Sequence, residues 1–86
     1  MEIFQADKPL VCTSRVPGLK QTHLRVLRSA SGSKVVATDP VGVREGNWVF
    51  TASGSAARYA AGDFGVLTDL TIVGIIDNWQ EDAGNE

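Results

Sequence analysis

The sequence is poor in the residues that make disulfides and metal sites. Its 86 residues include one cysteine, Cys12, and one histidine, His23. A lone cysteine cannot form an internal disulfide, and a single histidine far from it in the sequence is a weak basis for a metal site. Because Cys12 directly follows the apolar pair Leu10-Val11, we predict that its thiol is buried and unreactive.

Neither sign of charge dominates, and no apolar run is long. Eight basic residues against ten acidic ones give a formal charge of −2, which argues against broad, salt-driven binding of nucleic acid. The longest apolar stretch, Leu70–Ile76, is too short to cross a bilayer. The first residues, MEIFQADK, lack the apolar core of a signal peptide. We therefore expect a cytoplasmic protein without a membrane partner.

Short β-rich segments separated by turn residues run through most of the chain. We expect strands at Ile3–Thr13, Leu24–Leu27, Lys34–Thr38, Trp48–Ala52 and Leu70–Asp77. Pro9 lacks an N–H group and should lie at an edge, a bulge or a strand boundary. Alternation predicts that Leu24 and Val26 share one buried face. The pattern as a whole predicts one mainly β domain, a small barrel or sandwich.

One segment, SGSAARYAAG at residues 53–62, breaks this β pattern. Its alanines favour a short helix over Ser55–Ala61. We expect Ser53 or Ser55 to cap the start of this helix, and Gly62 to end it in a left-handed conformation. The small side chains would also let neighbouring backbones approach closely.

Several residues invite a catalytic interpretation that their surroundings do not support. The tripeptide Gly54-Ser55-Ala56 looks like the start of a hydrolase nucleophile turn, but the second glycine is missing and only His23 could act as the base. The phosphate-binding loop pattern is absent. The carboxylates Asp63, Asp69 and Asp77 fit turn and salt-bridge roles. We therefore predict neither an enzyme nor a cofactor.

A small barrel could instead bind single-stranded nucleic acid. Barrels of the OB type do so with a basic groove and stacking aromatic side chains. The aromatic residues of this chain are scattered and are not interleaved with Lys or Arg, which favours core packing for most of them. They are Phe4, Trp48, Phe50, Tyr59, Phe64 and Trp79. Binding of single-stranded nucleic acid stays open as the alternative function.

Four segments together resemble the CcmL/EutN family, the pentameric vertex proteins of bacterial microcompartment shells. They are Asp39–Gly42, Glu45–Val49, Ser53–Arg58 and Asp69–Asp77. The start of the chain, residues 1–15, also fits the family's first strand, so the resemblance covers about residues 1–79. The stretches RVPGLK, DPVGV, GSAARY and GDFGVLTDLTIVGIIDNW look most like the B-type vertex proteins of α-carboxysomes.

The resemblance implies a five-stranded, OB-like β-barrel with one short helix that assembles as a cyclic homopentamer. Such a ring caps the vertices of a polyhedral carboxysome shell that consists mainly of hexameric shell proteins. It closes the shell around Rubisco and carbonic anhydrase and so supports carbon dioxide fixation in photosynthesis. On this interpretation residues 1–79 are the vertex domain, and residues 80–86 are an acidic, flexible tail.

The start of the predicted helix is the candidate pore. We hypothesise that Ser53, Gly54 and Ser55 of five copies converge near the five-fold axis and line a narrow opening. Bulky side chains would collide at such a point, which would explain the small residues of this segment.

The rest of that segment is the candidate subunit interface. Ala56 would face a neighbouring subunit, and Arg58 would reach Asp69 or Asp77 of that neighbour, because the arginine fork suits a carboxylate. The alternative is that Ala56 and Ala57 only pack on their own barrel.

Overall fold

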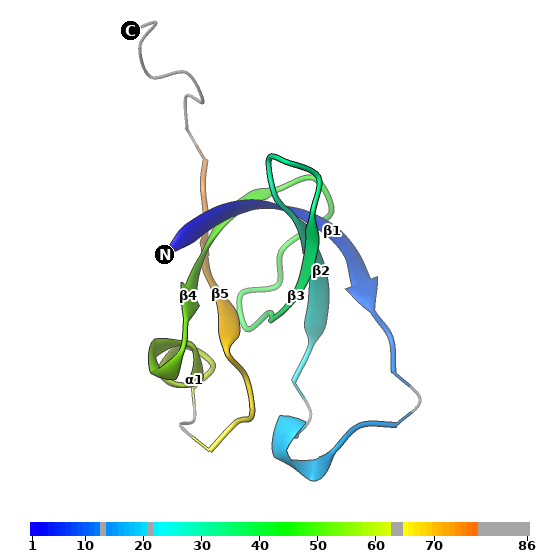
Figure 1. Ribbon diagram of the computed structural model, residues 1–86, viewed down its shortest axis with the longest axis vertical. Helices are drawn as coiled ribbons and strands as arrows, with labels where there is room; N and C mark the ends of the chain where they lie inside the picture. The colour runs from blue at the N-terminus through cyan, green and yellow to red at the C-terminus, as the bar shows by residue number, and fades with distance from the viewer. Residues whose placement is uncertain (13, 21, 63–64, 78–86) are drawn as a thin grey trace, which may run out of the picture.

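Five strands close into a barrel in the computed structural model, which describes residues 1–12, 14–20, 22–62 and 65–77. The strands are β1 (Glu2–Leu10), β2 (Leu24–Arg28), β3 (Lys34–Thr38), β4 (Trp48–Ser53) and β5 (Leu70–Ile75). Their order around the barrel is β1-β2-β3-β5-β4 (Figure 1). All neighbours pair antiparallel except β3 and β5, which pair parallel through Thr38 and Thr71. The predicted fold class is confirmed.

Strand β1 pairs with both β4 and β2 and bends between the two pairings. Its first half pairs with β4, so that Phe4 lies opposite Val49, and its second half pairs with β2, where Ala6 lies opposite Leu27. The register with β2 shifts between Ala6 and Pro9. An irregular point in the ladder accommodates a residue without an N–H group and increases the local bend. The prediction that Pro9 lies at an edge, a bulge or a strand boundary is confirmed, because the register shifts just before Pro9 and β1 ends one residue after it.

The barrel interior is filled by side chains from every strand and from the loop after β3. They are Phe4, Ala6, Leu27, Ala37, Val43, Val49 and Ile72. On β2 the prediction that Leu24 and Val26 share the buried face is wrong for Val26. Leu27 is fully buried because it lies opposite the inward residues Ala6 and Val35, which turns Val26 to the outer face.

After β1 the chain leaves the barrel, and the predicted burial of Cys12 is wrong. Strand β1 ends at Leu10, Val11 is 87% exposed and Cys12 is exposed as well. The chain continues into η1 (Pro17–Leu19), a short 3₁₀ helix at the lower end of the barrel (Figure 1). The Gly18 carbonyl accepts a hydrogen bond from the Leu67 N–H at 2.7 Å, which ties η1 to the loop before β5.

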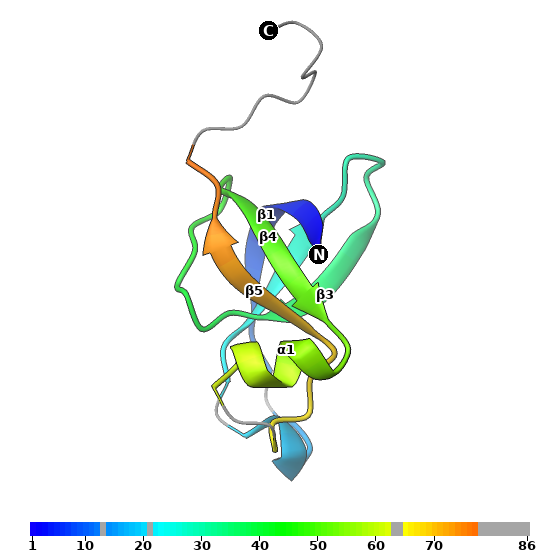
Figure 2. The same cartoon turned by 90° about the vertical axis from the view of Figure 1, so that its left-hand side faces the viewer.

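A chain of hydroxyl groups joins the parallel strand pair to the helix α1 (Ser55–Ala60), which lies across the barrel end where β4 stops and β5 begins (Figure 2). The Thr71 hydroxyl donates to the Ala57 carbonyl at 2.7 Å and lies 2.6 Å from the Thr38 hydroxyl. A hydroxyl has a single proton, so Thr38 must be the donor to Thr71. Thr38, Thr71 and Ala57 are all buried.

Replacing Thr71 by valine tests this chain of hydroxyl groups. T71V keeps the side-chain shape but removes both hydroxyl bonds of Thr71, the one to the Ala57 carbonyl and the one with Thr38, and leaves that carbonyl only the Ala61 N–H. We expect a loss of about 1–3 kcal/mol in the free energy of unfolding. Urea denaturation at one fixed protein concentration measures it. The matched control is T51V: Thr51 is equally buried, but its hydroxyl makes one long bond of 3.3 Å to the Glu2 carbonyl. Equal losses in the two variants would contradict the proposed role of Thr71.

Candidate functional site

The candidate pore residues form the exposed link between β4 and α1. Ser53, Gly54 and Ser55 are all exposed. The prediction that a serine side chain caps the helix is wrong, because Gly54 is the N-cap and no side chain bonds to the helix start. Gly54 has a φ of 65°, a region that glycine enters at little steric cost. The tight turn at this position therefore needs the glycine itself.

The two central alanines of α1 have different environments. Ala57 is fully buried, and its carbonyl accepts the Thr71 hydroxyl bond, so this residue packs on its own barrel. Ala56 is exposed. The helix ends at Ala60, one residue before the predicted end, and the predicted left-handed Gly62 is confirmed with a φ of 96°. Packing within the subunit thus accounts for the small size of Ala57 but not for that of Ala56.

The predicted interface residues lie at two different ends of the barrel. Arg58 and Asp69 line one shallow pocket of about 240 Å³ together with Leu67 and Thr68. Asp77 lies at the far end of β5, directly after Ile76, whose N–H bonds to the Trp48 carbonyl at the start of β4 (Figure 1). The structure therefore brings Arg58 and Asp69 together within one chain and keeps Asp77 apart from them. Asp63 lies outside the described residues.

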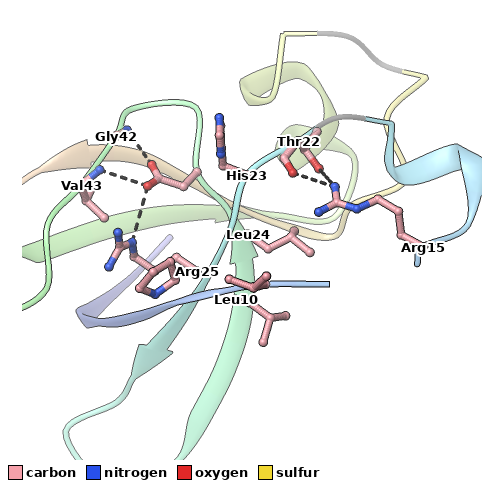
Figure 3. A pocket seen from close by; sticks show the side chains of 11 residues that line it. Leu10, Arg15, Thr22, His23, Leu24, Arg25, Gly42 and Val43 are labelled. Atoms are coloured by element: carbon pink, nitrogen blue, oxygen red, sulfur yellow. Dashed lines mark hydrogen bonds and ion pairs between the residues drawn. The ribbon is translucent and has the colours of Figure 1, made fainter. Parts of the chain in front are cut away.

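A larger pocket, of about 360 Å³, lies beside the ends of β1 and β2 (Figure 3). The pocket contains the buried carboxylate of Asp39, a residue that is 7% exposed and accepts several hydrogen bonds. One carboxylate oxygen accepts the N–H groups of Val41 at 3.1 Å and Gly42 at 2.8 Å, and the other accepts the N–H of Val43 at 3.0 Å. The Nε of Arg25 lies 3.7 Å from the same carboxylate. Sequence reasoning missed this arrangement.

The polar groups of this pocket are already engaged in holding loops. Arg15 donates to the carbonyl of Thr22 at 2.7 Å (Figure 3). It also donates to the carbonyl of Lys20 at 3.1 Å, and Arg25 donates to the carbonyl of Asp7. Arg15 holds the backbone at Lys20 and Thr22, Arg25 holds β1 at Asp7, and Asp39 shapes the turn after β3. An aspartate that starts a loop containing Pro and Gly is the sequence signal of such an Asx-type turn. The charged side chains Arg15, Arg25 and Asp39 of this pocket therefore have a structural role.

Neither a cluster of metal ligands nor a membrane-spanning helix is found among the described residues. Within residues 1–12, 14–20, 22–62 and 65–77, no three His, Cys, Asp or Glu side chains are placed so that they could hold a metal ion. None of the helices in the same ranges is long and apolar enough to cross a membrane.

In the part of the chain that the structure describes, the aromatic side chains of the barrel do not form a basic stacking surface. Of the aromatic residues that the structure describes, only Phe4 is in the core: Trp48 and Phe50 are half-buried on the outer face of β4, and Tyr59 is 71% exposed. The prediction of core packing for most of the aromatic residues is therefore wrong for the described ones, and Phe64 and Trp79 lie outside them. The cross-strand neighbours of Trp48 and Phe50 on β1 are Gln5 and Ile3, not Lys or Arg. This arrangement does not support the alternative of single-stranded nucleic-acid binding.

Comparison with known proteins places the sequence and the fold in a family. The family model described as ethanolamine utilisation protein EutN/carboxysome matches residues 1–77. The chain belongs to the EutN/CcmL family. The resemblance found in the sequence is thereby confirmed. The boundary at residue 79 and the tail at residues 80–86 stay predictions, because residues 78–86 lie outside the described part of the chain.

Two EutN/CcmL relatives match nearly their whole length. The carboxysome shell vertex protein CsoS4B of Halothiobacillus neapolitanus is 58% identical over 79 residues, which are 92% of this chain and 98% of the relative. CsoS4B of Prochlorococcus marinus subsp. pastoris is 65% identical over 71 residues, covering 83% of this chain and 97% of the relative. The B-type vertex resemblance therefore extends over most of the chain.

Solved structures of EutN/CcmL proteins have the same barrel. The structure of CsoS4B from Halothiobacillus neapolitanus has a TM-score of 0.85 at 58% identity and covers 91% of this chain and 100% of that one. The GrpN pentameric microcompartment shell protein from Rhodospirillum rubrum has a TM-score of 0.79 at 29% identity, covering 93% of this chain and 98% of that one. Similarity in fold thus extends to a relative described as a pentamer.

The Asp39 carboxylate provides a test of the larger pocket. D39N keeps the size of the side chain but turns an NH₂ group toward N–H donors and removes the charge facing Arg25. We expect it to lower the free energy of unfolding by about 1–3 kcal/mol or more, because buried donors lose their acceptor. E45Q, at an exposed carboxylate, is the control and should change little. If D39N unfolded at the same urea concentration as the wild type, the structural role of Asp39 would be refuted.

Proposed function

We propose that this chain is a structural subunit that assembles as a homopentamer and caps the vertices of a carboxysome shell. The observation that carries the proposal is the full-length match, in sequence and in fold, to proteins named carboxysome shell vertex proteins. The pentameric form of a more distant family member supports the ring. Its role is to supply shape rather than to catalyse a reaction.

The ring explains how so small a protein performs this function. Copies related by a head-to-tail contact leave no unpaired interface if the contact closes after five subunits. A five-fold unit placed in a layer of six-fold units forces that layer to curve. The expected partners are therefore the hexameric shell proteins that surround the vertex. The closed shell then encloses Rubisco and carbonic anhydrase and supports carbon dioxide fixation.

The helix start faces the five-fold axis in this proposal. Ser53, Gly54 and Ser55 line the narrow opening, and their exposure in the single chain is consistent with that position. Ala56 lies next to them and is exposed, although its neighbour Ala57 is fully buried. A small exposed residue at this place fits a point where five copies crowd together.

The charged residues around α1 act between subunits in this proposal. Arg58 and Asp69 border one shallow pocket, so the arginine of one copy lies where it could contact the next copy at this end of the barrel. Asp77, at the other end, would meet a different part of the neighbour. Arginine fits these positions because its planar fork pairs with a carboxylate through two hydrogen bonds.

The crowding at Ala56 is testable. We expect A56L to lose the pentamer, because a leucine on each of five copies would collide near the axis. Native mass spectrometry measures the assembly state, and circular dichroism checks that the barrel still folds. The matched control is A30L, the same change at an exposed residue in the β2–β3 hairpin loop, which should stay pentameric. An intact ring in A56L would place the helix away from the axis.

The role in the shell has its own test in cells. We expect cells that lack this chain to make elongated or leaky shells, because the vertices stay open, and resupply of the chain should restore closed polyhedra. Negative-stain electron microscopy of purified shells measures their shape. Shells that are closed and regular without the chain, and without a second vertex protein in its place, would rule out vertex closure.

A further inference from the structure

One side of the barrel carries an unusually apolar outer surface. We call it the apolar face and define it by Ile3, Trp48, Phe50 and Ile76, on β1, on β4 and just after β5. Ile3 lies opposite Phe50, and the Ile76 N–H bonds to the Trp48 carbonyl, so the four residues are neighbours across three strands. Ile3 is 42% exposed, and the other three are partly exposed. Figure 2 faces β4 and β5.

A glycine flattens this surface. Gly74 lies opposite Phe50 in the β4–β5 ladder. A Cβ atom at position 74 would come within 2.4 Å of the Phe50 ring, so the ring lies directly over the bare backbone of β5. The aromatic ring covers the glycine instead of projecting outward. The result is a low, apolar surface of the kind that packs against another protein.

The outer face of β2 and β3 is different in charge. We call it the basic face and define it by Val26, Arg28, Lys34 and Val36. Val26 lies opposite Val36, and Arg28 lies opposite Lys34. Val36 is 45% exposed, and both cations are exposed. The carboxylate of Asp7 lies 3.9 Å from Arg28 and 3.7 Å from Lys34, so it neutralises one of the two positive charges.

Charge at the margin of the apolar face has the opposite sign. Glu2 and Asp77 are exposed and come one residue before Ile3 and one residue after Ile76. Because strand residues alternate faces and Glu2 pairs with the buried Thr51, these carboxylates lie at the edges of the apolar face rather than on it, with the amino group of Met1 next to Glu2. Arg44 and Glu45, in the turn before β4, offset each other. Two apolar faces meeting in a symmetric dimer would bring like carboxylates together. An apolar face meeting a basic face would instead pair carboxylates with Arg28 and Lys34 around an apolar centre.

We propose that the apolar face of one subunit packs against the basic face of the next. The inference rests on the proposed homopentamer and adds which surfaces join its subunits. The two faces belong to different strands on different sides of the barrel, β4 and β5 against β2 and β3 (Figure 1). A contact between two unlike surfaces is head-to-tail, which is the kind of contact that a ring requires. The partner is a second copy of this chain.

A charge placed on either face tests the assignment. I3E and V36E each put a carboxylate in the centre of one face, and we expect each variant to lose the pentamer peak in native mass spectrometry. Both positions are exposed in the single chain, so circular dichroism should show a folded barrel. The control A30E carries the same charge in the β2–β3 hairpin loop and should remain pentameric. A folded, pentameric I3E or V36E would overturn the assignment.

Chemical cross-linking gives a second measurement that does not require the ring to break. In a C12S background, the double variant I3C/V36C is treated with a short bis-maleimide. We expect a ladder of covalent species up to five subunits, because position 3 of one copy then faces position 36 of the next. Each single variant should give no ladder, because neither face meets itself.

The two proposals fail differently in these experiments. A wild-type chain that stays monomeric at micromolar concentration would contradict the proposed homopentamer itself. A pentameric wild type with a pentameric I3C/V36C variant that gives no ladder would leave the homopentamer intact and overturn only the assignment of its contact faces.

Discussion

Closure of the barrel depends on its shortest seam, the parallel pairing of β3 with β5. A parallel pair needs a long connection, and here that connection contains the whole of β4 and α1. The backbone register joins only Thr38 and Thr71, and the hydroxyl groups of the same residues add a bond between the strands and a bond to Ala57 of α1. The helix α1, the strand β5 that follows it and the strand β3 are therefore held together at one point. The placement of Ser53, Gly54, Ser55 and Ala56 depends on that point.

Local sequence patterns were sufficient for the strands and turns and insufficient for side-chain direction. β-Branched runs such as KVVAT and WVFTA, with Gly and Pro between runs, marked the elements, and the family resemblance supplied the barrel. Which residue of β2 faces inward was decided by pairing with β1 and β3, so Leu27 rather than Val26 is buried. Cys12 is exposed because β1 stops two residues before it. Neither fact is encoded in the nearest neighbours along the chain.

For the candidate sites, too, the sequence predicted the local elements but not how distant residues come together. The small residues of the helix start were visible in the sequence, and so was the short helix. The clustering of Arg58 with Asp69 and the separation of Asp77 became visible only once β5 was placed. The Asp39 carboxylate, which holds three backbone N–H groups and faces Arg25, required both the loop and β2 in position. Its sequence signal, an aspartate before proline, marked a turn without indicating the ion pair.

The contact between Phe50 and Gly74 couples two positions that are 24 residues apart in the chain. Any related sequence with a side chain at position 74 has no room for an aromatic ring lying over β5 and needs a smaller residue at position 50, or a ring turned outward. Positions 50 and 74 should therefore vary together among relatives, and a change at one without the other would alter the shape of this surface. Substitution histories at this pair would record how the contours of that side of the barrel have changed among relatives.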